Sequence, residues 1–155
     1  MKEFIKGLYE VFASQNGVGG LLAGVQEIGR YTTQQKLYPA IAIIPERRVP
    51  IGADGSYAYQ YYECHAQIGL YSRMPDGWTA TEVEAHIDLE RALEKTLMDN
   101  SRLVTTSYPN GLLSVTEELE IIEAAYDLSM PGTRVYVTGW KVMGKMVFRD
   151  GVIGL

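Results

Sequence analysis

The stretch YECHAQIGLYSR, residues 62–73, decides the fold because apolar and polar side chains alternate along it. The alternating members are Cys64, Ala66, Ile68 and Leu70 on one side and Glu63, His65, Gln67 and Gly69 on the other. A period of two is typical of a strand that buries one face. The sequence therefore predicts a strand over roughly 57–73 with Cys64 in the core.

The same alternation argues against joint chemistry at Cys64 and His65. Adjacent strand residues point to opposite faces, whereas a nucleophile and its base must come within about 3 Å of each other. We interpret Cys64 as a small core side chain. As the only cysteine in the chain, it also excludes an internal disulfide and a multi-cysteine zinc site.

Upstream of this strand, the sequence predicts a helix, a strand and a loop. KEFIKGLYEVFASQ, residues 2–15, has the apolar spacing of an amphipathic helix, which the glycines of NGVGG should end. The segment from Leu21 to Ile28 is compatible with a second short helix. YPAIAIIPE, residues 38–46, is typical of a buried strand, and RRVPIGADGS, residues 47–56, is expected to be an exposed loop.

Downstream, WTATEVEAHIDLERALEKTLMDN, residues 78–100, predicts a helix with His86 on the face that packs against the sheet. A capping box is expected at its start, formed by Thr79 with Glu82 or by Thr81 with Glu84. Glu90 lies close to the packed face and needs a partner, because an unpaired buried carboxylate is costly.

The last third predicts a hairpin around SMPGT, residues 129–133. RVYVTGWKVMGKMVFRD, residues 134–150, is a strand by composition. SVTEELEIIEAAYDL, residues 114–128, fits either a helix or a strand, and we interpret it as a strand. The expected fold is one α+β domain, residues 1–155, with a mostly antiparallel four-stranded sheet packed against helices in the order α-β-β-α-β-β.

Composition and motifs indicate no enzyme. The net charge of −5 argues against a sequence-independent grip on nucleic acid, and the charged start of the chain against a signal peptide or membrane span. GVGGLL, residues 17–22, lacks the third glycine of a dinucleotide-binding loop, and no serine occupies a G-x-S-x-G turn. We therefore expect no catalytic residue, no metal site and no cofactor.

Three tyrosines at strand spacing, Tyr57, Tyr59 and Tyr61, follow the loop arginines Arg47 and Arg48. Tyrosine presents a large apolar body with a polar tip, which suits surfaces that become buried on association. These five residues are the candidate subunit or partner interface. A cross-strand aromatic ladder within one domain is the alternative.

Three stretches give the chain a resemblance to a known family: YPAIAIIPE after an N-terminal helix, CHAQIGLYSR running into the helix WTATEVEAHIDLERALEKTL, and the terminal RVYVTGWKVMG. In the order of its elements the chain resembles the tail-terminator (tail-completion) proteins of long-tailed bacteriophages. The resemblance implies a ring, typically a hexamer, that caps the tail tube, ends tail polymerisation and provides the head-docking surface.

The partners implied by the resemblance are further copies of the chain, the tail tube protein and the head–tail connector protein, with DNA only as transiting cargo. The implied location is the virion, at the head–tail junction, after assembly in the host cytoplasm. Two alternatives stay open. One is another phage neck or head-completion protein, and the other is a ferredoxin-like binding module, which the acidic pI disfavours.

Overall fold

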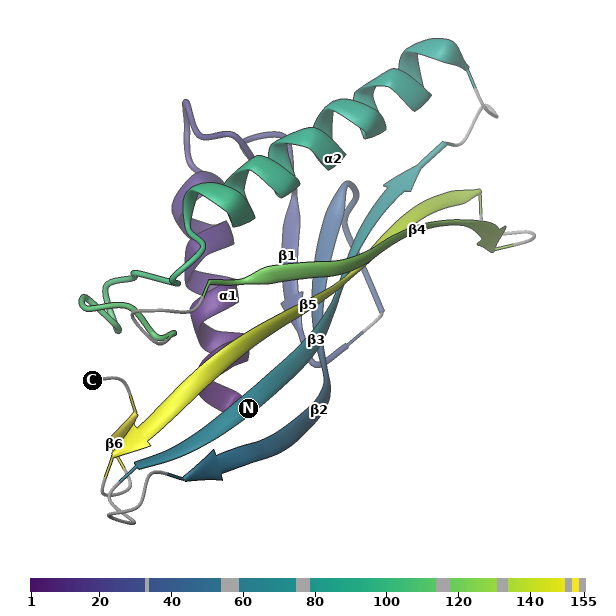
Figure 1. Ribbon diagram of the computed structural model, residues 1–155. Coiled ribbons are helices and arrows are strands. Elements are labelled where there is room, and N and C mark those ends of the chain that lie inside the picture. The colour runs from purple at the N-terminus through teal and green to yellow at the C-terminus, as the bar shows by residue number, and fades with distance from the viewer. Residues whose placement is uncertain are drawn as a thin grey trace.

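The computed structural model describes residues 1–32, 34–53, 59–74, 79–113, 118–130, 134–149 and 152–153. They form two helices and six strands (Figure 1). The elements in chain order are α1 (Lys2–Gln15), β1 (Glu27–Arg30), β2 (Ala40–Ala53), β3 (Tyr59–Arg73), α2 (Ala80–Asp99), β4 (Glu120–Met130), β5 (Val135–Arg149) and β6 (Val152–Ile153). The predicted α+β class is confirmed.

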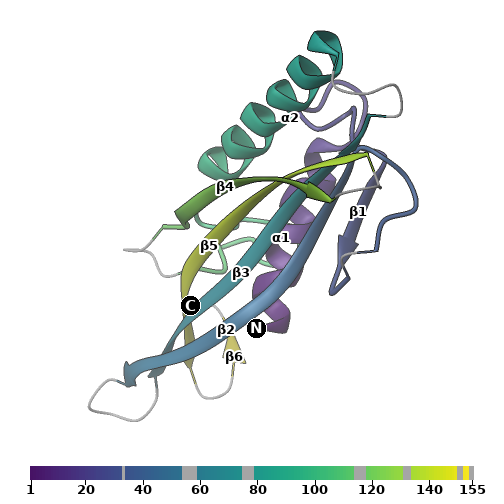
Figure 2. The ribbon, with the colours of Figure 1, turned by 90° about the vertical axis from the view of Figure 1, so that its right-hand side faces the viewer.

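All six strands belong to one sheet in the order β1-β2-β3-β5-β4, with β6 paired to the end of β5. Figure 2 shows β4, β5, β3 and β2 side by side in that order. β1 runs parallel to β2, and the other pairings are antiparallel. The four long strands are the predicted ones, but the expected order α-β-β-α-β-β omitted β1 and β6.

β1 replaces the short helix considered for Leu21 to Ile28. Its four residues pair with the start of β2, from Glu27 opposite Ala40 to Arg30 opposite Ile43. A strand this short shows no readable periodicity in the sequence. Only its tertiary pairing with β2 makes it a strand.

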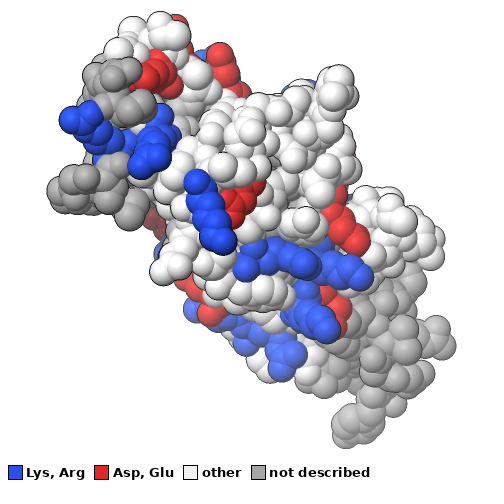
Figure 3. Space-filling model, turned by 180° about the vertical axis from the view of Figure 1, so that it is seen from behind, with Lys and Arg blue, Asp and Glu red and all other residues white. Residues whose placement is uncertain are grey.

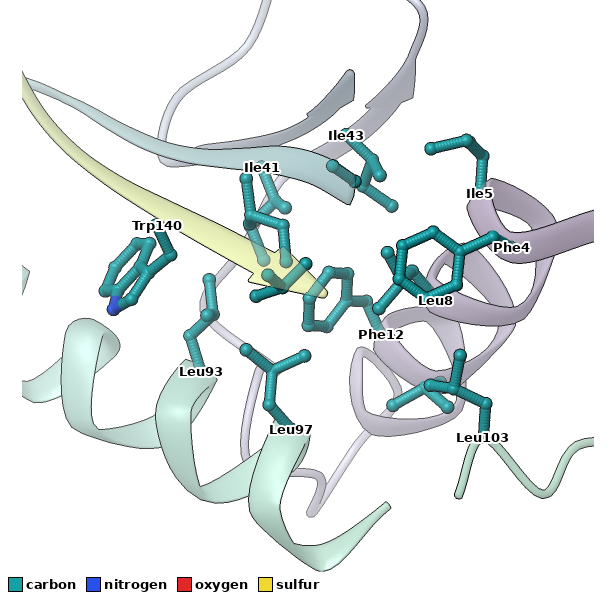
Figure 4. Packing of buried hydrophobic residues seen from close by; sticks show 14 of the residues in the cluster. Phe4, Ile5, Leu8, Phe12, Ile41, Ile43, Leu93, Leu97, Leu103 and Trp140 are labelled. Atoms are coloured by element: carbon teal, nitrogen blue, oxygen red, sulfur yellow. The ribbon is translucent and has the colours of Figure 1, made fainter. Parts of the chain in front are cut away.

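One face of the sheet carries the core, and both helices pack against it. Leu8 and Phe12 of α1 and Leu93 and Leu97 of α2 belong to one buried cluster with sheet side chains such as Ile41, Ile43 and Trp140 (Figure 4). The side chains of Cys64, Ala66, Ile68 and Leu70 are fully buried. The prediction that these alternating residues of the 62–73 stretch face the core is confirmed.

The predicted loop at 47–56 is wrong over residues 47–53, because β2 continues to Ala53 paired with β3. Beyond Ile43, β2 has a described neighbour on one side only. Pro45 and Pro50 fit there, since an edge strand does not need every backbone N–H. Register shifts between Pro45 and Arg47 and between Pro50 and Gly52 accommodate extra residues, as β-bulges do.

The open question at 114–128 is settled from Glu120 onward, where β4 is a strand paired with β5. Residues 114–117 lie outside the described part of the chain. At the start of α2 the cap is Thr79 rather than Thr81, because the Thr79 hydroxyl accepts a hydrogen bond from the Glu82 backbone N–H at 3.3 Å, which is one half of the expected capping box. At the end of α1, the Asn16 side-chain amide donates to the carbonyls of Leu22 and Val25, at 2.8 Å each.

Candidate functional site

The candidate interface arginines lie on β2 and point to opposite faces of the sheet. Arg47 stands opposite His65 on the outer face, which the helices do not cover, and Arg48 stands opposite Cys64 on the core face. Both side chains are exposed. The Arg48 guanidinium stacks 4.5 Å from the ring centre of Tyr62, whereas Arg47 has no acidic partner among the described side chains. Arg47 is therefore an available cation.

The tyrosine row is only partly described. Tyr57 lies outside the described residues, and Tyr59 is placed on β3 by its backbone alone. Tyr61 is half-buried and stands opposite Gly52. The structure therefore places Arg47 and Tyr61 on the same outer face, and their role as an interface stays a prediction.

Cys64 and His65 are separated by the strand as expected. Burial raises the pKa of the Cys64 thiol, which disfavours the reactive thiolate. His65 belongs to the outer face, yet it is buried, and its Nε2 lies 2.6 Å from the Glu63 carboxylate. Neither residue forms a nucleophile and base pair with the other.

A buried polar cluster links α2 to the sheet through His86. Its Nδ1 lies 2.6 Å from the Ser72 hydroxyl, and its Nε2 lies 2.9 Å from the Thr138 hydroxyl. Thr138 in turn donates to Glu90 at 2.5 Å. Because Thr138 gives its proton to Glu90, its oxygen accepts from Nε2–H, and Nδ1 accepts from Ser72. Glu90 thus has the partner that the sequence required.

Serine, histidine and glutamate in one cluster are also the residue types of an acyl-transfer site, but the electrostatics argue against that use. Burial lowers the pKa of His86 to about 4, which makes it a weak general base at neutral pH. The Glu90 carboxylate, 3.3 Å from Nε2, favours the charged ring but is engaged by Thr138. The arrangement is suited to joining α2 to the sheet. Sequence reasoning missed Ser72 and Thr138, which carry no local signal.

The outer face has a groove of about 290 Å³, floored by small residues. Gly69, Gly139 and Ala125 stand opposite one another on β3, β5 and β4. The ring of Tyr71 covers Gly69, and a Cβ there would lie 2.6 Å from Tyr71 Cε2, so the ring would have to shift. A Cβ on Gly139 would meet no described atom closer than 4.0 Å. Such a strand glycine often marks close approach by another molecule.

β4 forms one edge of the sheet and is exposed over its described side chains. Ile121 and Ile122 expose 37% and 51% of their surface, large values for isoleucine. Glu120 at the start of β4 and Glu118 just before it precede these isoleucines, and neither glutamate has a cationic partner among the described side chains. We call Glu118, Glu120, Ile121 and Ile122 the acidic strip.

The edge at β2 has the opposite charge. Arg47 and Arg48 are exposed there, together with Ile51, which exposes 43% of its surface. We call these three residues the basic strip. On the side seen in Figure 3, Lys and Arg form a broken band that covers more of the surface than Asp and Glu, although the net charge of the chain is −5.

The chain matches no protein-family model and no curated protein. Among the described residues, neither helix is long and apolar enough to cross a membrane. The described part of the chain also contains no group of three or more His, Cys, Asp or Glu side chains placed to hold a metal ion. The two charged strips and the outer groove are the candidate functional surfaces.

Proposed function

We propose that this chain is a structural virion assembly protein, a tail terminator that forms a ring on the tail tube of a long-tailed bacteriophage. The observation that carries the proposal is the open sheet with two unlike edges. β4 ends it on one side with the acidic strip, and the second half of β2 forms part of the other edge and carries the basic strip.

Two unlike surfaces on one subunit favour a head-to-tail contact rather than a two-fold one. In such a heterologous contact each copy uses its first surface on one neighbour and its second surface on the other, and the chain of copies closes into a ring when the rotation between subunits allows it. A hexamer is the expected ring size from the resemblance. Association, rather than catalysis, is then the work of the protein.

The arrangement of the elements behind the resemblance also supports the proposal. YPAIAIIPE gives the first half of β2, CHAQIGLYSR gives most of β3 before α2, and RVYVTGWKVMG gives most of β5. β2, β3 and β5 are neighbours in the sheet. These stretches therefore build the continuous centre of the sheet. A ring of such subunits has two sides, one that can face the tube and one that can face the connector. An acidic subunit would let DNA pass without gripping it.

The test is a tube-capping assay. The tail tube protein of the same genome is polymerised alone and with this chain, and tube lengths and ends are measured by electron microscopy. The proposal predicts shorter tubes with extra density at one end, and no effect on tubes from an unrelated phage. Unchanged tube lengths with the chain left unbound would refute it, as would a genome that encodes no tube protein.

A further inference from the structure

We infer that the acidic strip on β4 binds the basic strip on β2 of a second copy of this chain. This inference rests on the proposed function and identifies the contact that would close the ring. The first observation is that exposed charged side chains at both edges of the sheet lack partners within the described part of the chain. Glu118 and Glu120 at one edge, and Arg47 at the other, form no ion pair with a described side chain.

The two strips match in apolar character as well as in charge. Ile121 and Ile122 lie beside the two glutamates, and Ile51 lies beyond the two arginines, all three partly exposed. Isolated exposed apolar residues are common, but here they accompany unpaired charges at both edges. A copy that docks its acidic strip on the basic strip of its neighbour buries the isoleucines and pairs the charges.

The position of the strips gives the contact a direction. They lie on opposite edges of one sheet, with β3 and β5 between them. One subunit cannot pair its own strips, so the match is satisfied only between copies. After each contact one strip of each kind remains free at the ends, which is the condition for continued addition and closure.

Side chains rather than backbone groups carry this contact. On β2, Pro45 and Pro50 offer no N–H, and two register shifts interrupt the ladder. On β4, the register shifts between Ile121 and Glu123. Prolines and bulges at an edge discourage strand addition. The contact should therefore weaken with salt and respond to charge reversal.

The experiment reverses the charge of each strip in a separate variant and then mixes the two variants. One variant carries Arg47→Glu with Arg48→Glu, and the other carries Glu118→Lys with Glu120→Lys. The matched control reverses two exposed α2 carboxylates, Glu84→Lys with Asp88→Lys. Solution mass is measured for each alone and for the two strip variants mixed. Single Arg47→Glu serves as a milder variant, because Arg48 also stacks on Tyr62.

Each strip variant alone should lose the ring, with the subunit contact weakened by roughly 10- to 100-fold, while the control keeps it. The mixture should regain the ring, because every contact in an alternating assembly is again complementary. If the wild type forms a ring and both strip variants form it too, or if their mixture stays dissociated, this inference alone is overturned. A wild-type chain that is monomeric even at tube ends overturns the proposed function with it.

Discussion

The buried His86 should make the stability of this protein depend on pH between 7 and 4. Burial lowers the pKa of His86 from 6.5 to about 4 in the folded chain. As pH falls below 6.5, His86 becomes protonated in the unfolded chain but stays neutral in the folded chain. The free energy of unfolding is therefore unaffected by the titration of His86 well above pH 6.5 and declines as pH falls towards 4. The loss from this group is about 2 kcal/mol at pH 5 and about 3 kcal/mol at pH 4.

Urea unfolding of the wild type and of His86→Gln at pH 7, 6 and 5 measures this loss. Carboxylates that titrate in both proteins cancel in the comparison, so the difference between the two curves reports His86. The wild type should lose about 2 kcal/mol more than the variant from pH 7 to pH 5, whatever their stabilities at pH 7. If the two proteins lose stability equally with pH, Glu90, which lies 3.3 Å from His86, keeps a proton on His86, and the pKa of His86 is not lowered in the folded chain.

Further substitutions test the packing and the cap. Cys64→Ser should cost about 1–3 kcal/mol by placing a hydroxyl in the core, measured by urea unfolding, and leave assembly intact. Gly144→Ala should lower the free energy of unfolding by about 1–3 kcal/mol, because the added Cβ would lie 2.9 Å from Phe4 Cε2. Gly139→Ala, whose added Cβ would meet no described atom closer than 4.0 Å in the outer groove, should keep or raise stability, and it should weaken assembly if a partner enters that groove. Thermal unfolding of Thr79→Ala should show a loss of about 1 kcal/mol from the missing cap, and an unchanged midpoint would contradict the capping contact.

The sequence predicted the elements that have a strong period. Alternation identified β3 and its buried face, and helical spacing identified α1 and α2. The cost of burying Glu90 predicted that it has a partner. These signals are local, because a strand or helix that buries one face must repeat its apolar residues along the chain.

What the sequence could not predict depends on pairing between distant segments. The prolines of RRVPIGADGS indicated a loop, whereas β3 holds residues 47–53 in an edge strand that tolerates them. β1 exists only because β2 lies beside it. Ser72 and Thr138 reach His86 from two strands, and the acidic strip became visible only when β4 proved to be an edge.

If unlike sheet edges join copies of this chain into a ring, the solution mass must show it. The measurement is light scattering after size exclusion, over a range of protein concentrations and with tube ends added. We expect the mass of a closed ring, a hexamer on the resemblance, either alone or on the tube ends. A mass that stays at 17.3 kDa under every condition would contradict it.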